Sequence, residues 1–104
     1  MKKNVSLYEL NALECPGCDQ PNLHQRKVST FWRIEDAESG VRVVTQFVHT
    51  LVDKEMRGNP SPRRDGILID FECEHCDAEP RLSIVQHKGI TLVQWESMRR
   101  TIQD

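Results

Sequence analysis

Two short stretches decide the fold of this chain: Cys15-Pro16-Gly17-Cys18 and Cys73-Glu74-His75-Cys76. Together they contain all 4 cysteines of the 104 residues. Each is a Cys-x-x-Cys turn, which places two thiolates close enough to bind one ion from the same side. Two such turns supply the four sulfur ligands that tetrahedral zinc prefers, at Zn–S distances of roughly 2.3 Å. We therefore predict one structural Zn²⁺, with Cys15, Cys18, Cys73 and Cys76 as its ligands.

The local chemistry of the two turns supports this prediction. Backbone N–H groups just after the first cysteine of such a turn point toward its sulfur and stabilise the thiolate. Pro16 and Gly17 suit the turn, because proline fixes φ and glycine relieves crowding, whereas Glu74 and His75 are less tailored to it. Four thiolates leave no open coordination position, so we expect the ion to build the fold and not to activate water. Metal binding contributes roughly 10–16 kcal/mol in small zinc domains.

The two turns resemble the knuckles of the zinc-ribbon, or rubredoxin-knuckle, group, whose members join two Cys-x-x-Cys turns with antiparallel strands. The matching features are the four cysteines and a β-hairpin at 82–95, after the second turn. Two features depart from the group: Asp19 and Asp77 stand where glycine is common, and residues 19–72 make a long separation. The resemblance implies a metal site and a β fold. It implies no particular function, because zinc ribbons serve transcription, translation, enzymes and protein assembly alike.

Alternating apolar and polar residues predict the strands between the two turns. Residues 27–34 and 41–52 read as two strands joined by a polar loop ending in Gly40, and we expect them to pair as an antiparallel hairpin inserted into the ribbon at about 27–52. The segment 53–66 is rich in proline, glycine and charge, which predicts an exposed, mobile loop. A strand at 67–73 then leads into the second turn.

The best-defined element is the hairpin of 82–87 and 90–95 around Lys88-Gly89. A two-residue turn there places Val85 opposite Leu92, Ile84 opposite Val93 and Leu82 opposite Trp95, so that apolar residues face one another. The pattern as a whole predicts a single, mainly β domain spanning 1–104.

Short helices are expected at the two ends of the chain. Ser6 and Glu9 have capping-box spacing before a helix within 4–14, although an irregular or extended lead-in fits this segment nearly as well. Residues 96–102, capped by Ser97, are compatible with a terminal helix.

Composition narrows the functional classes. The net charge of -2 argues against a protein that holds nucleic acid mainly by bulk attraction. The amino terminus lacks the apolar core of a signal peptide, and no stretch approaches the roughly 20 apolar residues that span a bilayer. We therefore expect a soluble cytoplasmic protein, in which paired cysteines indicate metal and not disulfides.

Other readings of the cysteines remain open. The pairs are also compatible with redox dithiols, although thioredoxin-like chemistry requires a βαβ context that this sequence lacks. Four thiolates would equally bind iron in a rubredoxin-like centre, for which the low aromatic content offers little apolar shielding. His75 is an alternative ligand, but an exposed side chain on the second turn is the simpler interpretation.

The remaining polar residues give no indication of an enzyme. His24, His49 and His87 are scattered along the chain and form no recognisable triad. Asp70 and Glu72 share one strand face, which is more typical of a solvated surface than of a paired acid and base. No glycine-rich phosphate loop is present.

Binding is the better hypothesis. We predict a small interaction module that acts as an adaptor for a protein partner. The alternative is a nucleic-acid-binding zinc ribbon using Arg57, Arg63 and Arg64 of the loop, helped by basic residues beside Phe31 and Trp32. The simpler interpretation of these residues is that Trp32 lies in the core and that the arginines form an ordinary solvated surface. Apolar residues on both faces of 41–52 also make a homodimer plausible.

Overall fold

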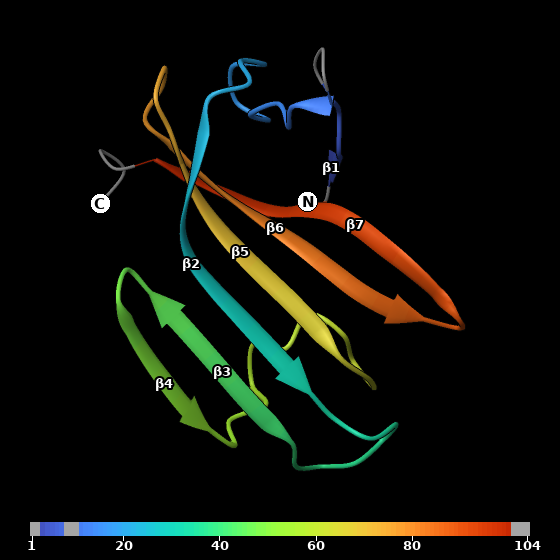
Figure 1. Ribbon diagram of the computed structural model, residues 1–104. Helices are drawn as coiled ribbons and strands as arrows, with labels where there is room; N and C mark the ends of the chain where they lie inside the picture. The colour runs from blue at the N-terminus through green and yellow to red at the C-terminus, as the bar shows by residue number, and fades with distance from the viewer. Residues whose placement is uncertain (1–2, 8–10, 101–104) are drawn as a thin grey trace.

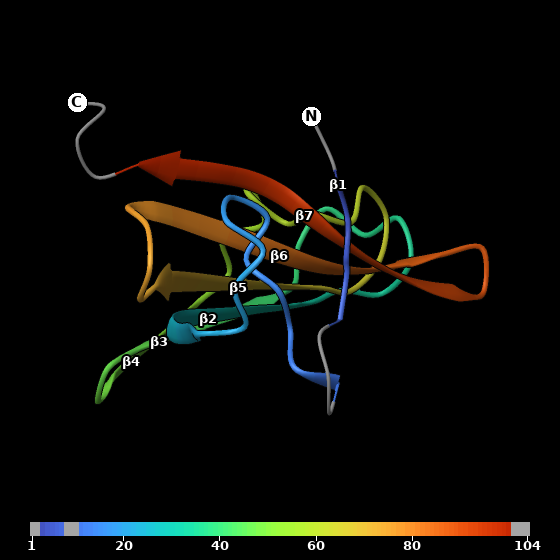
Figure 2. The same ribbon diagram turned by 90° about the horizontal axis from the view of Figure 1, so that it is seen from above.

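The computed structural model describes residues 3–7 and 11–100, with side chains for 5–7 and 11–96. In these residues seven strands form one open, fully antiparallel sheet in the order β1-β7-β6-β5-β2-β3-β4 (Figure 1). Their bounds are β1 Lys3–Asn4, β2 Leu23–Trp32, β3 Val41–Gln46, β4 His49–Asp53, β5 Gly66–Cys73, β6 Ala78–His87 and β7 Ile90–Arg100. The predicted mainly β class is therefore confirmed. Figure 2 shows the sheet twisting from β7 at one side to β4 at the other.

The last hairpin has the predicted register. Val85 pairs with Leu92, Ile84 with Val93, and Leu82 with Trp95. Lys88 and Gly89 both have positive φ, 50° and 82°, which is the geometry of the type I′ turn that matches the twist of a hairpin. The register shifts at Arg81, and the pairing then continues to the ends of both strands.

The predicted single strand at 41–52 is wrong, because the chain turns back within it. β3 ends at Gln46 and β4 begins at His49, so that Phe47 and Val48 form a two-residue turn. Phe47 has φ 57°, a conformation that glycine adopts easily and a bulky residue rarely does. No glycine, proline or asparagine signals this turn in the sequence. The guanidinium of Arg26 lies 4.5 Å from the centre of the Phe47 ring and helps to hold it.

The predicted helix at 96–102 is also wrong. Residues up to Arg100 belong to β7 and pair with the first residues of β6, for example Met98 with Pro80. This long-range pairing overrides the weak local preference for a helix. Residues 101–104 lie outside the described residues.

The helix expected within 4–14 falls partly on residues 8–10, which lie outside the described residues. Before them β1 pairs with β7, and Leu7 forms a single bridge with Leu13. Asn11, directly after them, lies in a 3₁₀ turn and has φ 61°.

Successive side chains of β2 point to opposite faces of the sheet. Phe31 is buried, whereas Trp32 is 55% exposed, so the interpretation of Trp32 as a core residue is wrong. Phe31 shares its face with Gly66 and Val85, and this face is covered by the loop 54–65. Ser61 of that loop is buried and donates a hydrogen bond to the Gln86 carbonyl. The loop is thus not exposed throughout, and its mobility stays a prediction.

The opposite face, which we call the open face, carries a continuous row of side chains across six strands. Register places its members side by side; they are Val52, Val43, Thr30, Ile67, Ile84 and Val93. We call this set, apolar except for Thr30, the apolar row. Trp32 and Val41 form the neighbouring pair on β2 and β3. Nearer the cysteines, the same face buries Trp95, whose ring meets Phe71 edge-on at 5.8 Å.

Gly40 is required at the end of the loop 33–40, which connects β2 to β3. A Cβ at this position would clash with the backbone carbonyl oxygen of Trp32 and lie 3.0 Å from the Met56 sulfur. We expect Gly40→Ala to lower the free energy of unfolding by about 1–3 kcal/mol, the typical cost of overpacking. Urea unfolding measures it, with the exposed neighbour Ser39→Ala as control at within about 0.5 kcal/mol. Equal stability of the two variants would contradict this close approach.

Candidate metal centre

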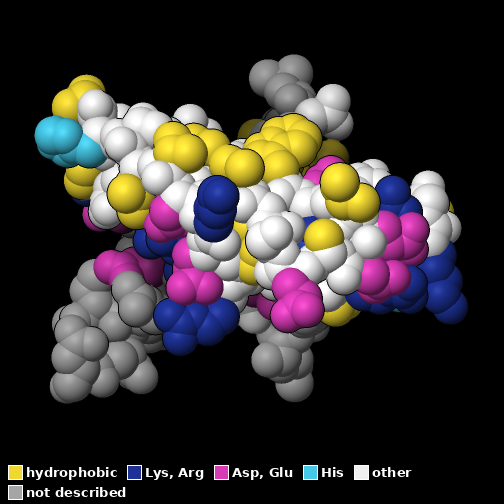
Figure 3. All heavy atoms as spheres, turned by 90° about the horizontal axis from the view of Figure 1, so that it is seen from below, with side chains coloured by type: hydrophobic (Ala, Val, Ile, Leu, Met, Phe, Trp, Pro, Cys, Tyr) yellow, Lys and Arg dark blue, Asp and Glu magenta, His cyan; other side chains and the backbone are white. Residues whose placement is uncertain are grey.

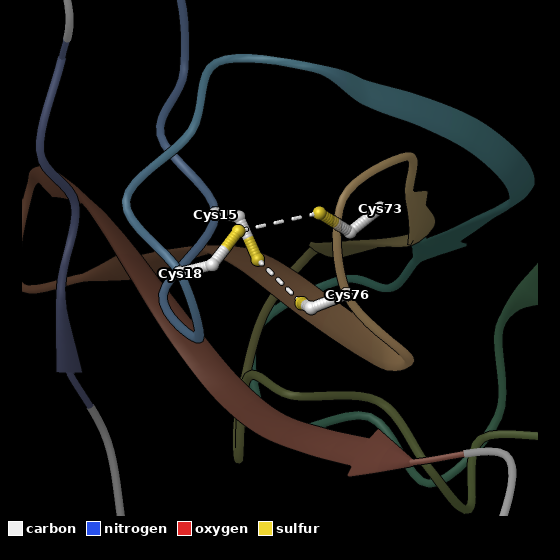
Figure 4. Close-up of side chains that lie close together, drawn as sticks. All are labelled: Cys15, Cys18, Cys73 and Cys76. Carbon is white, nitrogen blue, oxygen red and sulfur yellow. Dashed lines mark hydrogen bonds between the residues drawn. The ribbon is translucent and has the colours of Figure 1, made fainter.

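The four cysteines come from two separated parts of the chain that the sheet brings to one end. Cys15 and Cys18 lie in the turn before β2, Cys73 is the last residue of β5, and Cys76 lies in the connection to β6. Because β2 pairs with β5 in a register that places Leu23 opposite Cys73, the two turns must meet. Figure 4 shows the side chains from both turns directed into the space between them.

The spacing of the sulfurs fits a single tetrahedral ion. All four Sγ atoms lie within 4.8 Å of one another. The Cys15–Cys76 and Cys18–Cys73 Sγ pairs are 3.8 and 3.6 Å apart. A tetrahedron of sulfurs at roughly 2.3 Å from zinc has S–S edges of about 3.8 Å. These separations are far too long for disulfides, and all four cysteines are free thiols. The predicted convergence of the four sulfurs is confirmed.

The two turns hold their first sulfur in the same way. The Gly17 N–H donates to Cys15 Sγ at 3.3 Å, and the His75 N–H donates to Cys73 Sγ at 3.4 Å. Asp19 closes the first turn by donating its N–H to the Cys15 carbonyl at 2.8 Å. Asp19 has φ 65°, which explains why glycine suits this position; aspartate is among the few other residues that tolerate it.

Burial and these hydrogen bonds set the acidity of the thiols. Cys15 is fully buried, and burial raises the pKa of its thiol to about 12. Burial likewise raises the pKa of Cys18. It acts in the same direction on Cys73, but hydrogen bonds from the backbone of His75 and Cys76 outweigh it and lower the pKa of Cys73 to about 7. These four residues would hold a metal ion as thiolates, because a coordinating thiol is deprotonated outright.

The second cysteine turn is hydrogen-bonded to the residues that follow the first cysteine turn. The Glu74 N–H donates to the Asn22 carbonyl at 3.1 Å, and the His75 ring hydrogen-bonds the Asn22 side chain at 2.7 Å. Glu74 also pairs with His24. His75 therefore lies outside the sulfur cluster, as the simpler interpretation of this residue predicted. Asn22 is the residue that sequence reasoning missed, since a lone asparagine in a turn gives no signal of this role.

The surroundings of the cluster are small and only partly apolar. Ala78 is buried against Cys15 and Cys73, and Leu23 packs on the same group. Cys18 and Cys76 are partly exposed. The cluster thus has a metal site's donor set and geometry, while the identity of the metal is a separate question.

The three loop arginines proposed for nucleic acid each contact acidic side chains. Arg63 binds Asp36 through Nε at 2.6 Å and Nη2 at 2.8 Å. Arg64 contacts Glu35 at 3.4 Å, and Arg57 contacts Glu55 of its own loop at 2.9 Å. The structure does not bring the three together into one unpaired basic surface.

The other polar residues considered in the sequence are dispersed as well. Asp70 pairs with Arg81 at 2.7 Å and Glu72 with Arg26 at 3.0 Å, so the two carboxylates serve separate ion pairs. His49 and His87 are exposed residues beside hairpin turns.

Comparison of the chain with protein-family models, curated proteins and solved structures gives no match. Among the described residues, no helix has the length and apolar character needed to cross a membrane. What the fold and the site define is a class: a small, mainly β protein with a four-cysteine cluster suited to a metal ion.

Proposed function

We propose that this protein is a zinc-ribbon-like interaction module, in which one structural Zn²⁺ fixes the sheet and the open face binds a protein partner in the cytoplasm. The observation that carries the proposal is the apolar row, which crosses six strands and is exposed at both ends: Val52 is 62% and Val93 43% exposed. Free thiols in a buried cluster support a reducing compartment.

A structural role for the ion follows from its ligands. Four sulfurs fill the coordination sphere of tetrahedral zinc and leave no position for water or substrate. Zinc is favoured over iron because the cluster has few apolar neighbours to shield a redox centre, with Leu23 and Ala78 the residues packed on it among those described. A zinc protein is colourless, whereas ferric iron bound by four thiolates is strongly coloured.

The open face has the character of a protein-binding surface. Trp32 and Val41 widen the apolar row on β2 and β3, and both are exposed. Figure 3 shows hydrophobic side chains gathered along one side of the molecule, at the top of that view. Contiguous apolar surface of this kind marks interaction sites, and tryptophan is prominent among residues that contribute most to binding.

The alternative, nucleic-acid binding, has less support. Arg63 and Arg64 already lie against Glu35 and Asp36, so phosphate would have to displace these acids or meet their charge. The overall charge of -2 adds no attraction.

Affinity capture from extracts of the native cell tests the proposal. We expect the wild type to capture a partner protein. The double variant Trp32→Ser with Val52→Ser should capture at least about tenfold less of it, as for loss of a central aromatic contact. Ile34→Ser is the matched control, because Ile34 is 83% exposed yet lies outside the row. Equal capture by all variants, or nucleic-acid binding lost in Arg63→Ala with Arg64→Ala, would contradict it.

A further inference from the structure

The β4 edge of the sheet is unprotected. At the other edge, β1 has 2 residues and pairs with Gln94 and Trp95 of the 11-residue β7, so among the described residues that edge is covered in its middle only. β4 has 5 residues in unbroken register with β3, and its outer side pairs with nothing in the described chain. It contains no proline, lysine or bulge, and Leu51 is 53% exposed. We propose that β4 pairs antiparallel with β4 of a second copy, with Leu51 of both copies meeting on the two-fold axis.

The β3–β4 hairpin determines which backbone groups are free for this pairing. Gln46 and His49 flank its two-residue turn and pair directly. In such a hairpin this flanking pair is hydrogen-bonded, and the bonded pairs then alternate along the strands. His49 and Leu51 therefore direct their N–H and C=O groups toward β3. Thr50 and Val52 direct theirs outward, where a second strand can accept and donate.

Side-chain complementarity selects one register from those that this alternation permits. With Thr50 opposite Val52 of the second copy, about four backbone hydrogen bonds form. The same register places Leu51 of one copy opposite Leu51 of the other. At each end of the paired strands, His49 of one copy lies opposite Asp53 of the other. A shift by two residues in one direction puts Asp53 opposite Phe47, and in the other direction opposite Leu51. Only the central register gives each Asp53 a basic partner and leaves apolar side chains together.

Asp53 can take part without losing its existing partner. Its carboxylate accepts from Arg42 Nε at 2.9 Å and from Arg42 Nη2, and from the Glu55 N–H at 3.0 Å. A carboxylate has about four acceptor positions, so an imidazole N–H can be added. This interface lies at the opposite edge of the sheet from β7 and is distinct from the metal centre. It uses the backbone of Val52, whereas the adaptor function proposed above uses the side chain of that residue on the open face.

Sedimentation velocity of the zinc-loaded protein from about 1 to 100 μM tests the pairing. We expect a dimer that Thr50→Pro weakens at least about tenfold, because proline removes an outward N–H from each copy and is tolerated on an edge strand. Leu51→Lys should weaken it as well, by placing like charges on the axis. A strict monomer, or a dimer unaffected by both substitutions, overturns the proposal.

Cysteine cross-linking tests the register. Directly opposed residues of a non-hydrogen-bonded pair have Cα atoms about 4.5 Å apart, within disulfide reach, so Leu51→Cys should cross-link to itself under mild oxidation. Thr50→Cys is the matched control, since Thr50 of the two copies lie more than about 7 Å apart. Cross-linking at Thr50 and not at Leu51 overturns the proposal. Zinc content, measured in parallel, reports any separate failure of the metal site.

Discussion

Chelation of the metal should unfold the protein. The two cysteine turns are joined to β2, β5 and β6, and the cluster buries Cys15, Cys73 and Ala78 together. Binding of structural zinc contributes roughly 10–16 kcal/mol in small domains, which matches or exceeds a typical net stability of about 5–15 kcal/mol. We expect a strong chelator to abolish the β-sheet circular dichroism and cooperative unfolding, and added Zn²⁺ to restore both.

A matched pair of substitutions distinguishes loss of the metal from disturbance of the first cysteine turn. Cys15→Ser removes a sulfur ligand and should give a metal-free, unfolded chain. Asp19→Gly changes the same turn but suits its positive φ, so it should retain the metal and the fold. A chelated protein with an unchanged spectrum and unfolding curve would show that the ion does not build the fold.

The second large effect is expected at Trp95. Its side chain is 3% exposed, lies opposite Leu82 and contacts the Phe71 ring. Truncation of a buried tryptophan typically costs about 3–5 kcal/mol, so Trp95→Ala should lose a large share of a typical domain stability of about 5–15 kcal/mol. Denaturant unfolding of the zinc-loaded protein measures this loss, with the metal kept in excess so that its binding is not limiting.

Trp32 provides the control within the same molecule. It is 55% exposed on the open face, so Trp32→Ala should change the free energy of unfolding by less than about 1 kcal/mol while weakening partner binding. Similar losses of stability at the two tryptophans would contradict the assignment of one to the core and the other to a binding surface.

Local signals explain what the sequence predicted correctly. The four cysteines lie in turns whose geometry is encoded within a few residues, so the pairing of thiols within each turn follows from spacing alone. The Lys88-Gly89 turn fixes the register of β6 and β7 because both residues adopt the required positive φ. The meeting of the two cysteine turns depends in addition on the pairing of β2 with β5, which the four-sulfur site itself implies.

Long-range packing explains the errors. The turn at Phe47 and Val48 lacks any turn residue, so 41–52 reads as one strand; the Phe47 ring is instead in contact with Arg26, a residue distant in the sequence. Residues 96–100 are extended because they belong to β7 and β7 pairs with β6. The exposure of Trp32 depends on which face the loop 54–65 covers, and that choice is made by contacts such as Ser61 with Gln86.

X-ray absorption at the metal edge, with metal analysis of protein purified from its native cell, tests the central claim most directly. We expect one zinc per chain with four sulfur ligands at roughly 2.3 Å and no nitrogen or oxygen ligand. A folded protein without metal, or an ion bound by fewer than four sulfurs, would contradict it, and iron in the site would contradict the assignment of zinc.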